Sequence, residues 1–233
     1  MEELELDNTP ASPQPQPTSG ASDRDENNKK QVLQLKKLWS DNAIPPEGAS
    51  RPKQPIEKLS KLFQYSYVVN VWFQTKCWIW MAQIGLSELY HWVSIKQEGR
   101  SIEKLRRVYQ LDFGRVPWLI DVVRGSLVVD DLYQVQALLN IVCSDPDVTV
   151  VRGKNRFVTG KKDTGYRDIQ LTVRCNGFAF DALPGYNQAN VGLDEDTCQK
   201  LCAEVQIHLK AFHDFKDDES HKGYTEWRAI MGE

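Results

Sequence analysis

The chain has 233 residues, of which 41% are hydrophobic and 26% are charged, and its formal net charge is −3. These averages exclude a collagen-like fibre, a membrane channel, a small disulfide scaffold and a strongly basic nucleic-acid coat. Eight of the eleven prolines lie within residues 1–56, where Trp39 is the only aromatic residue. We therefore expect a disordered tail and linker over residues 1–55, an aromatic-rich helical segment over residues 56–95, and a folded domain over residues 96–233.

The cysteines and the N-terminus indicate the compartment. The first residues are acidic and contain no apolar stretch, which excludes a secretory signal and an Arg-rich transit peptide. The five cysteines are an odd number and widely spread, so we interpret them as reduced thiols of a cytoplasmic protein. Cys198 and Cys202 lie four residues apart with His208 nearby, an arrangement that allows a zinc site. Because the sequence contains no second such pair, we favour two cysteines near the start of a strand.

The N-terminal part of the chain is predicted to be helical. Residues 29–41 predict one short helix, and the proline-rich residues 44–55 predict a linker. Residues 56–95 predict one long or two broken helices, because apolar residues recur at three- and four-residue steps. Polar residues such as Lys76 leave the apolar stretch far shorter than the about 20 residues of a membrane span. We favour a buried helix; the alternative is an interfacial helix that forms a homo-oligomer or binds a partner through its tryptophans.

The rest of the chain alternates between helical and strand patterns, with Asp130 or Asp131 as the predicted N-terminal cap of the helix over residues 132–142. Asn176-Gly177 predicts the turn of a hairpin. The element order predicts an α+β fold, with a mixed sheet of about four to five strands flanked by helices. The predicted helices cover residues 101–110, 117–123, 132–142 and 210–230, and the predicted strands cover residues 126–129, 148–157, 167–174, 178–180 and 203–208.

A basic block follows the helix predicted over residues 132–142. Residues 152–174 contain seven Lys or Arg residues and only two Asp residues. Arg152, Lys154 and Arg156 are two positions apart, so in a strand they lie on the same face. One interpretation is an ordinary solvated strand face. The other is an anion site, since three cations on one face repel one another unless a polyanion binds there. Phosphate groups are the natural ligand, because Arg binds them through two hydrogen bonds and Lys as a point charge.

Two carboxylates accompany the basic block. Asp121 precedes the first predicted strand, and Glu204 lies in the last predicted strand, where it shares a face with Gln206 and His208. A polar strand face is often simply solvated. The alternative is a site for a Mg²⁺-bound nucleotide, because Mg²⁺ is held by one or two carboxylates together with phosphate oxygens.

Three motifs resemble one known family. They are LIDVVRG at residues 119–125, GYRDI at residues 165–169 and CAEVQI at residues 202–207, with SIEKL at residues 101–105 as a weaker fourth. In this order and spacing they resemble the synthetase domain of the RelA/SpoT family, which has a nucleotidyltransferase-like fold and makes (p)ppGpp. The chain resembles a divergent member of that family, and the resemblance covers a little over half of its length.

The resemblance implies a site and a reaction. Asp121 and Glu204 would hold Mg²⁺, and both are the implied catalytic residues, with Glu204 as the general base on a ribose hydroxyl. Tyr166 would stack on the guanine. The implied partners are ATP and a guanosine nucleotide that accepts pyrophosphate at its 3′ hydroxyl; no DNA and no transmembrane segment are expected. The other residues assigned to nucleotide binding are Arg124, Lys154, Arg156, Arg167, Gln206 and Gln170.

The sequence also departs from the family pattern. Gln170 occupies the position of a family histidine, and a glutamine side chain carries no positive charge. The basic loop before residue 101 retains Lys96 and Arg100. Three alternatives therefore stay open beside pyrophosphate transfer to a guanosine nucleotide. They are a weak or inactive domain that binds a nucleotide or a protein, a toxin-like pyrophosphotransferase with another acceptor, and an unrelated interaction domain with chance motifs.

Overall fold

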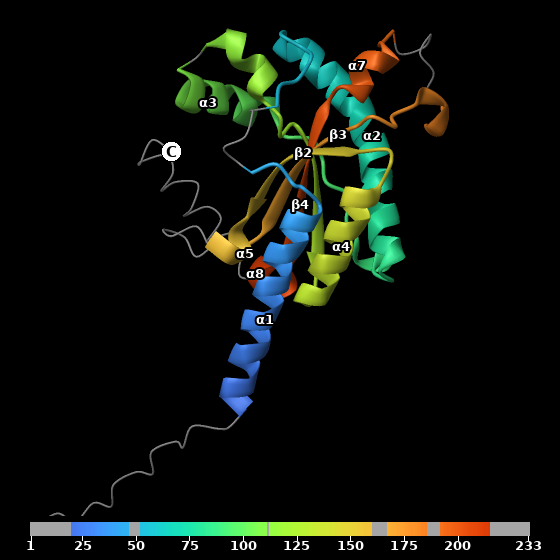
Figure 1. Cartoon of the computed structure of the whole chain (residues 1–233). Coiled ribbons are helices and arrows are strands. Elements are labelled where there is room, and N and C mark those ends of the chain that lie inside the picture. The colour runs from blue at the N-terminus through green and yellow to red at the C-terminus, as the bar shows by residue number, and fades with distance from the viewer. Residues whose placement is uncertain (1–19, 47–51, 111, 160–166, 186–191, 215–233) are drawn as a thin grey trace, which may run out of the picture.

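The computed structural model describes residues 20–46, 52–110, 112–159, 167–185 and 192–214. Within this part of the chain, four strands form one mixed sheet in the order β1-β4-β3-β2. β1 and β4 are parallel, and the β4–β3 and β3–β2 pairs are antiparallel. The predicted α+β class, with a mixed sheet flanked by helices, is confirmed (Figure 1). The strands are β1 (Val123–Val129), β2 (Thr149–Asn155), β3 (Ile169–Arg174) and β4 (Cys202–Leu209).

The helices include four long ones and several single turns. The long ones are α1 (Gly20–Asp41), α2 (Leu59–Gln83), α3 (Glu98–Tyr109) and α4 (Leu132–Ser144). The short α-helices are α5 (Arg156–Thr159), α7 (Glu195–Gln199) and α8 (Lys210–His213). The 3-10 helices are η1 (Ser87–Leu89), η2 (Phe113–Trp118) and η3 (Phe180–Ala182).

One face of the sheet is apolar and covered by helices. At Gly125 of β1, an added Cβ atom would meet Cys77 and Phe73 of α2, so helix and strand are in close contact there. α4 contacts β1, β2 and β4, and its N-terminus is capped by Asp131, as the sequence predicted. Strand residues alternate in direction, so the residues next to Gly125 project to the opposite face. α3 lies apart from α2 and α4 in Figure 1, on the side of that second face.

The N-terminal segment differs from the expected tail. The helix predicted over residues 29–41 ends at Asp41 but already begins at Gly20. Its residue Leu35 is fully buried, and Ile44, which follows the helix, is only 5% exposed. Both belong to the core of the domain because few apolar residues at helical spacing suffice to attach a polar helix. The C-terminal part of α1, from Leu35 on, and the residues that follow it up to 46 are therefore packed on the domain, whereas the start of α1 projects away from it (Figure 1). Residues 1–19 and 47–51 lie outside the described residues.

A single buried helix covers residues 59–83 of the segment 56–95, which was predicted to be helical throughout. α2 buries Trp72, Phe73 and Trp80 against the sheet and ends at Gln83, after which the chain continues as η1 and extended backbone. Tyr67 and Trp78 lie on its outer side, 64% and 47% exposed. No helix of the described residues is both long and apolar enough to span a membrane.

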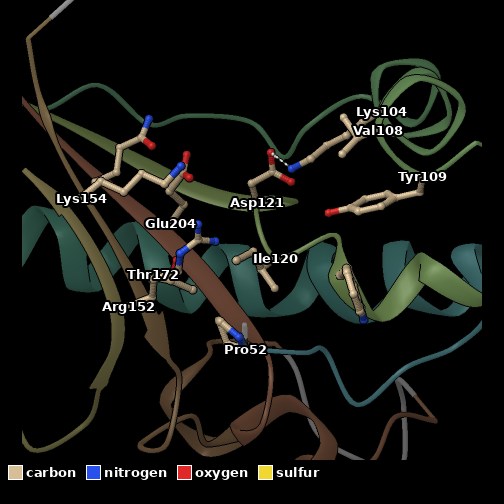
Figure 2. A pocket seen from close by; sticks show the side chains of 12 residues that line it. Pro52, Lys104, Val108, Tyr109, Ile120, Asp121, Arg152, Lys154, Thr172 and Glu204 are labelled. Atoms are coloured by element: carbon tan, nitrogen blue, oxygen red, sulfur yellow. Dashed lines mark ion pairs between the residues drawn. The ribbon is translucent and has the colours of Figure 1, made fainter. Parts of the chain in front are cut away.

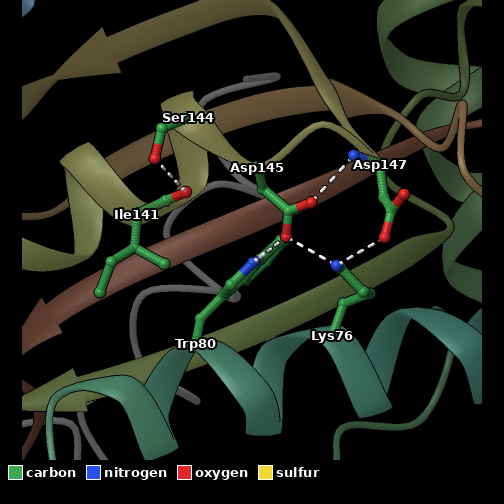
Figure 3. A network of polar contacts seen from close by, with 6 residues as sticks. All are labelled: Lys76, Trp80, Ile141, Ser144, Asp145 and Asp147. Carbon is green, nitrogen blue, oxygen red and sulfur yellow. Dashed lines mark hydrogen bonds and ion pairs between the residues drawn. The ribbon is translucent and has the colours of Figure 1, made fainter.

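A polar network fixes α2 to the loop that follows α4 (Figure 3). Lys76 contacts Asp145 at 2.7 Å and Asp147 at 2.9 Å, and the Trp80 indole donates to Asp145 at 2.7 Å. Burial alone would raise the pKa of Asp145, but the hydrogen bonds from Lys76 and Trp80 hold that pKa below its ordinary value. Asp145 and Lys76 therefore stay ionised at neutral pH, and their contact holds α2 in place behind the sheet.

Two predicted elements are wrong. Residues 117–123 are no helix, because η2 ends at Trp118 and Val123 already belongs to β1. Residues 178–180 are no strand. Phe178 instead donates to the carbonyl of Cys175 in a turn, and its ring packs edge-on against Trp72 at 6.1 Å. Of the predicted helix over residues 210–230, the described residues contain α8, and its remainder lies outside them.

Candidate functional site

A pocket of about 240 Å³ lies on the second face of the sheet (Figure 2). It is bounded by α3 and η2 on one side and by strands β2, β3 and β4 on the other. Its lining combines two carboxylates, three cations and two aromatic rings. The lining residues are Pro52, Lys104, Val108, Tyr109, Trp118, Ile120, Asp121, Arg152, Lys154, Gln170, Thr172 and Glu204.

The strand register arranges the polar residues of this face in rows across the sheet. Arg152 of β2 pairs with Thr172 of β3, Thr172 pairs with Glu204 of β4, and Glu204 pairs with Arg124 of β1. Paired residues project to the same face. Glu204 therefore shares its row with Arg124 on the adjacent strand β1 and with Arg152 on β2, which lies beyond β3.

The next row is also polar. Lys154 pairs with Gln170, and Gln170 pairs with Gln206 of β4. The Gln206 amide donates a hydrogen bond to the Glu204 carboxylate. A row of one cation and two amides suits a ligand with several acceptor oxygens, such as a phosphate chain or a sugar. Gln170, where the family has histidine, occupies the centre of this row and lines the pocket.

Asp121 faces two lysines. Its Oδ2 accepts from Lys96 Nζ at 2.8 Å and from Lys104 Nζ at 2.9 Å. Lys104 belongs to α3, whereas Lys96 precedes α3, and the Lys96 backbone N–H donates to the carbonyl of Val122 at 2.9 Å. This backbone bond places Lys96 next to Asp121, which immediately precedes Val122. Figure 2 shows the Lys104–Asp121 ion pair beside the Glu204 carboxyl group.

The two carboxylates have opposite pKa shifts. Burial alone would raise the pKa of Asp121, but Lys104 and Lys96 outweigh it and hold that pKa well below its ordinary value. Burial raises the pKa of Glu204, and the negative charge of Asp121 raises it further. Burial also lowers the pKa of Lys96, against the attraction of Asp121. Such opposed shifts in one pocket are typical of functional sites.

The carboxylates fit a divalent cation. Asp121 Oδ1 is buried and has no hydrogen-bond partner among the described residues, whereas Oδ2 is engaged by the lysines. A buried carboxylate oxygen without a partner is costly, and a cation would satisfy it. Glu204 offers a second carboxylate in the same pocket. Mg²⁺ needs only one or two protein carboxylates when a nucleotide supplies phosphate oxygens, so Asp121 and Glu204 match its ligand preferences.

The remaining assigned residues lie in different places. Arg124 is in the row of Glu204, and its Nε is buried without a hydrogen-bond partner among the described residues. Arg156 is not in β2 but begins α5, where it forms a 2.7 Å ion pair with the fully buried Asp168. Arg167 donates to the carbonyl of Arg156 at 3.4 Å. Neither Arg156 nor Arg167 lines the pocket. Tyr166 lies outside the described residues.

Sequence reasoning assigned no role to an aromatic wall of the pocket. Tyr109 at the end of α3 and Trp118 of η2 contact each other edge to face, with ring centroids 5.7 Å apart. The guanidinium of Arg115 lies 4.2 Å from the centre of the Trp118 ring. The wrong helix prediction over residues 117–123 concealed this wall. Its signal in the sequence is the position of Trp118 directly before the LIDVVRG motif.

The ion pairs of Asp121 were also not predicted. The family resemblance marked SIEKL, which contains Lys104, and the loop residue Lys96, but neither was assigned to the site. Arg152 was recognised only as part of the basic block. Lys96 and Lys104 reach Asp121 from α3 and the segment before it, and Arg152 of β2 lines the same pocket as both carboxylates.

Comparisons with known proteins find similar solved structures, three of which are described below. No family model and no curated protein sequence matches the chain. The structure is similar to the small alarmone synthetase 1 from Bacillus subtilis, with 18% identity, a TM-score of 0.43, and coverage of 57% of this chain and 60% of that chain. This chain spans less than two thirds of that structure's own length.

Two further matches cover more of the chain. A GTP pyrophosphokinase family protein from Streptococcus pneumoniae matches with 17% identity, a TM-score of 0.49, and coverage of 71% of this chain and 76% of that chain. The Bacillus subtilis small alarmone synthetase 1 bound to AMPCPP matches with 16% identity, a TM-score of 0.47, and coverage of 71% and 77%.

Proposed function

We propose that this pocket transfers a pyrophosphoryl group from ATP to the 3′ hydroxyl of a guanosine nucleotide. The observation that carries the proposal is the meeting of Asp121 and Glu204 in one pocket surrounded by lysine and arginine side chains. Phosphoryl chemistry needs mainly positioning and neutralisation of charge, and this pocket supplies cations from both sides. The motif resemblance to (p)ppGpp synthetases supports the same reaction.

The proposed reaction exchanges one bond at the β-phosphorus of ATP for another. The acceptor 3′ oxygen forms a bond to the β-phosphorus of ATP, the bond from that phosphorus to the α,β-bridging oxygen breaks, and AMP leaves. Glu204 accepts the proton of the acceptor hydroxyl, a role that suits a carboxylate whose pKa is raised by burial. Mg²⁺, held by Asp121 and Glu204, would neutralise charge on the phosphate oxygens.

The cations have separate roles in the proposal. Lys96 and Lys104 approach from the α3 side and keep Asp121 ionised, so that it is ready to accept a cation at Oδ1. Arg152 and Lys154 approach from β2 and would contact phosphate oxygens of the nucleotides. Tyr109 and Trp118, whose rings lie edge to face at the pocket, offer aromatic surface suited to a nucleobase.

A second candidate function is a nucleotide-binding domain without catalytic activity. Gln170 supports it, because the centre of the polar row holds a neutral amide where the resembled family has a histidine. Such a domain would bind the same ligands through the same pocket but would not transfer the pyrophosphoryl group. A pyrophosphotransferase with an RNA acceptor is a third form of the proposal, with the same donor site.

The test is a transfer assay with ATP labelled at the γ-phosphate and Mg²⁺. GDP, GTP, ADP and tRNA are offered separately as acceptors, and products are separated by thin-layer chromatography. We expect label in a pyrophosphorylated guanosine nucleotide, and a loss of about 10²- to 10⁴-fold in Glu204→Gln, the usual contribution of a general base. Glu57→Gln, at an exposed position outside the pocket, is the control.

The outcomes separate the candidates. Label in tRNA alone would replace the guanosine acceptor by RNA. Absence of labelled product from every acceptor, together with binding of an ATP analogue and Mg²⁺, would favour the inactive binding domain. Neither binding nor transfer would contradict the proposal as a whole.

A further inference from the structure

The segment 52–56 passes directly beside the pocket. Pro52 lines the pocket, Lys53 lies 5.7 Å from the ring centre of Trp118, and Gln54 is only 3% exposed. A polar side chain buried to this degree in a proline-rich connection is unusual, because such connections normally run over the surface. The position of Gln54 therefore calls for a role in the domain rather than in a linker.

Gln54 connects two segments that are far apart in the sequence. Its Nε2 donates to the carbonyl of Leu119 at 3.2 Å and to the carbonyl of Cys202 at 3.1 Å. Its Oε1 accepts from the backbone N–H of Cys202 at 2.8 Å. The Gln54 backbone N–H also donates to the carbonyl of Pro117 at 2.6 Å. One side chain thus binds both backbone groups of Cys202, as a neighbouring strand would.

These contacts lie where the ladder between β1 and β4 begins. The first paired residues of the two strands are Val123 and Ala203. Leu119 lies four residues before Val123, so the ladder itself does not hold it, and Gln54 provides the connection from Leu119 to the start of β4. Both ends of this connection are close to the carboxylates, because Asp121 is two residues after Leu119 and Glu204 is two residues after Cys202.

We propose that Gln54 is a positioning residue that sets the spacing between the Asp121 and Glu204 carboxylates. The chemistry of the side chain explains why glutamine is required. Both hydrogens of Nε2 are used on carbonyl groups, and Oε1 is used on an N–H. A glutamate at this position would present oxygen to the two carbonyls, and a leucine or methionine would leave three backbone groups without partners.

The role in catalysis rests on the function proposed above, whereas the role in cation binding rests only on the two carboxylates. The experiment therefore measures binding of Mn²⁺ alone, by calorimetry, for the full chain and its variants. Gln54→Met keeps the side-chain length but removes both the donor and the acceptor. Gln54→Glu keeps the shape but replaces the Nε2 donor by an oxygen acceptor. The matched control is Gln199→Met, since Gln199 donates to one carbonyl, that of Phe178 at 3.0 Å, outside the pocket.

For Gln54→Met we expect Mn²⁺ affinity to fall by about 10- to 100-fold, the usual effect of removing a residue that orients metal ligands. Hydrogen exchange at the Cys202 amide should accelerate while the centre of β4 stays protected, and kcat should fall more than KM rises. Gln199→Met should retain wild-type Mn²⁺ affinity. Should Gln54→Met not fold, Gln54→Glu takes its place in the Mn²⁺ titration. Slow hydrogen exchange of the Cys202 amide in the wild-type chain then tests the hydrogen bond from that amide to Gln54.

The result that overturns the proposal is a folded Gln54 variant with wild-type Mn²⁺ affinity, or one weakened no more than Gln199→Met. A wild-type chain that binds Mn²⁺ but transfers no pyrophosphoryl group contradicts the proposed function, and the Mn²⁺ comparison then decides on Gln54 alone. A wild-type chain that binds no Mn²⁺ overturns the proposal for Gln54, whereas the transfer assay alone decides on the proposed function.

Discussion

Asp121 and Glu204 line the same pocket, yet their pKa values move in opposite directions. Two lysines lower the pKa of Asp121 against its burial, whereas burial and the negative charge of Asp121 raise that of Glu204. The pair therefore divides two tasks. Asp121 stays ionised and can hold a cation, and Glu204 can exchange a proton at a higher pH than an ordinary glutamate.

The lowered pKa of Asp121 predicts how stability depends on acid. A carboxylate with a depressed pKa stabilises the folded state above its unfolded value of 3.8, and this contribution is lost as the pH falls further. We expect Asp121→Asn to destabilise the protein at pH 6 and the difference to shrink between pH 4 and pH 2. The measurement is urea unfolding at each pH, with both proteins carrying Glu204→Gln, so that Glu204 does not titrate. A constant difference across this range would contradict the assigned ion pairs with Lys96 and Lys104.

The raised pKa of Glu204 predicts the opposite dependence. The folded state keeps the Glu204 proton at pH values where the unfolded chain has lost it, so this residue lowers stability as the pH rises above 4.5. Glutamine lacks this ionisation. We expect Glu204→Gln to gain stability relative to the wild-type protein from pH 4 to pH 8, while it loses activity. Glu57→Gln should show no such trend, and a stability difference that does not change with pH would contradict the raised pKa.

Part of this site was accessible from the sequence. Asp121 and Glu204 were identified because their motifs are local, and Lys154 because alternation along a strand is a local property. The residues that surround Asp121 were not assigned. Lys96 and Lys104 reach it through the placement of α3, which depends on packing between distant segments rather than on any local pattern.

In the fold, too, local patterns predicted some elements, whereas contacts between distant segments were not predicted. The α+β class, α2 and the capped α4 follow from periodicity and capping signals. The docking of α1 does not, because residues 1–56 are poor in apolar residues and only a few of them, such as Leu35 and Ile44, enter the core. The strand expected at residues 178–180 does not form, and Phe178 is instead fully buried with its ring edge-on against Trp72.

The basic residues of β2 predict that removal of one of their positive charges weakens nucleotide binding. Arg152 and Lys154 line the pocket on adjacent rows of the sheet. We expect Lys154→Met to weaken binding of a non-hydrolysable ATP analogue or of GTP by roughly 10- to 150-fold, which corresponds to about 1.5–3 kcal/mol for a hydrogen bond to a charged group. The effect should diminish at high salt. Fluorescence titration measures the affinity, with Lys200→Met, at the exposed residue that follows α7 outside the pocket, as the control. If Lys154→Met bound both nucleotides with wild-type affinity, Lys154 would be excluded from phosphate binding.

A substitution at Gly153 tests whether α1 packs on the folded domain. This glycine lies in β2, and an added Cβ atom would overlap with the Trp39 ring and with Ile44, which pack on the strand from the other side. Gly153→Ala must therefore displace the end of α1, and we expect it to destabilise the protein by about 1–3 kcal/mol, the usual cost of overpacking. Gly99→Ala is the control, because it lies in α3 with no atom within 4 Å of its added Cβ and should stabilise by about 0.5–1 kcal/mol. Urea unfolding measures both, and wild-type stability of Gly153→Ala would show that α1 does not pack on β2 in solution.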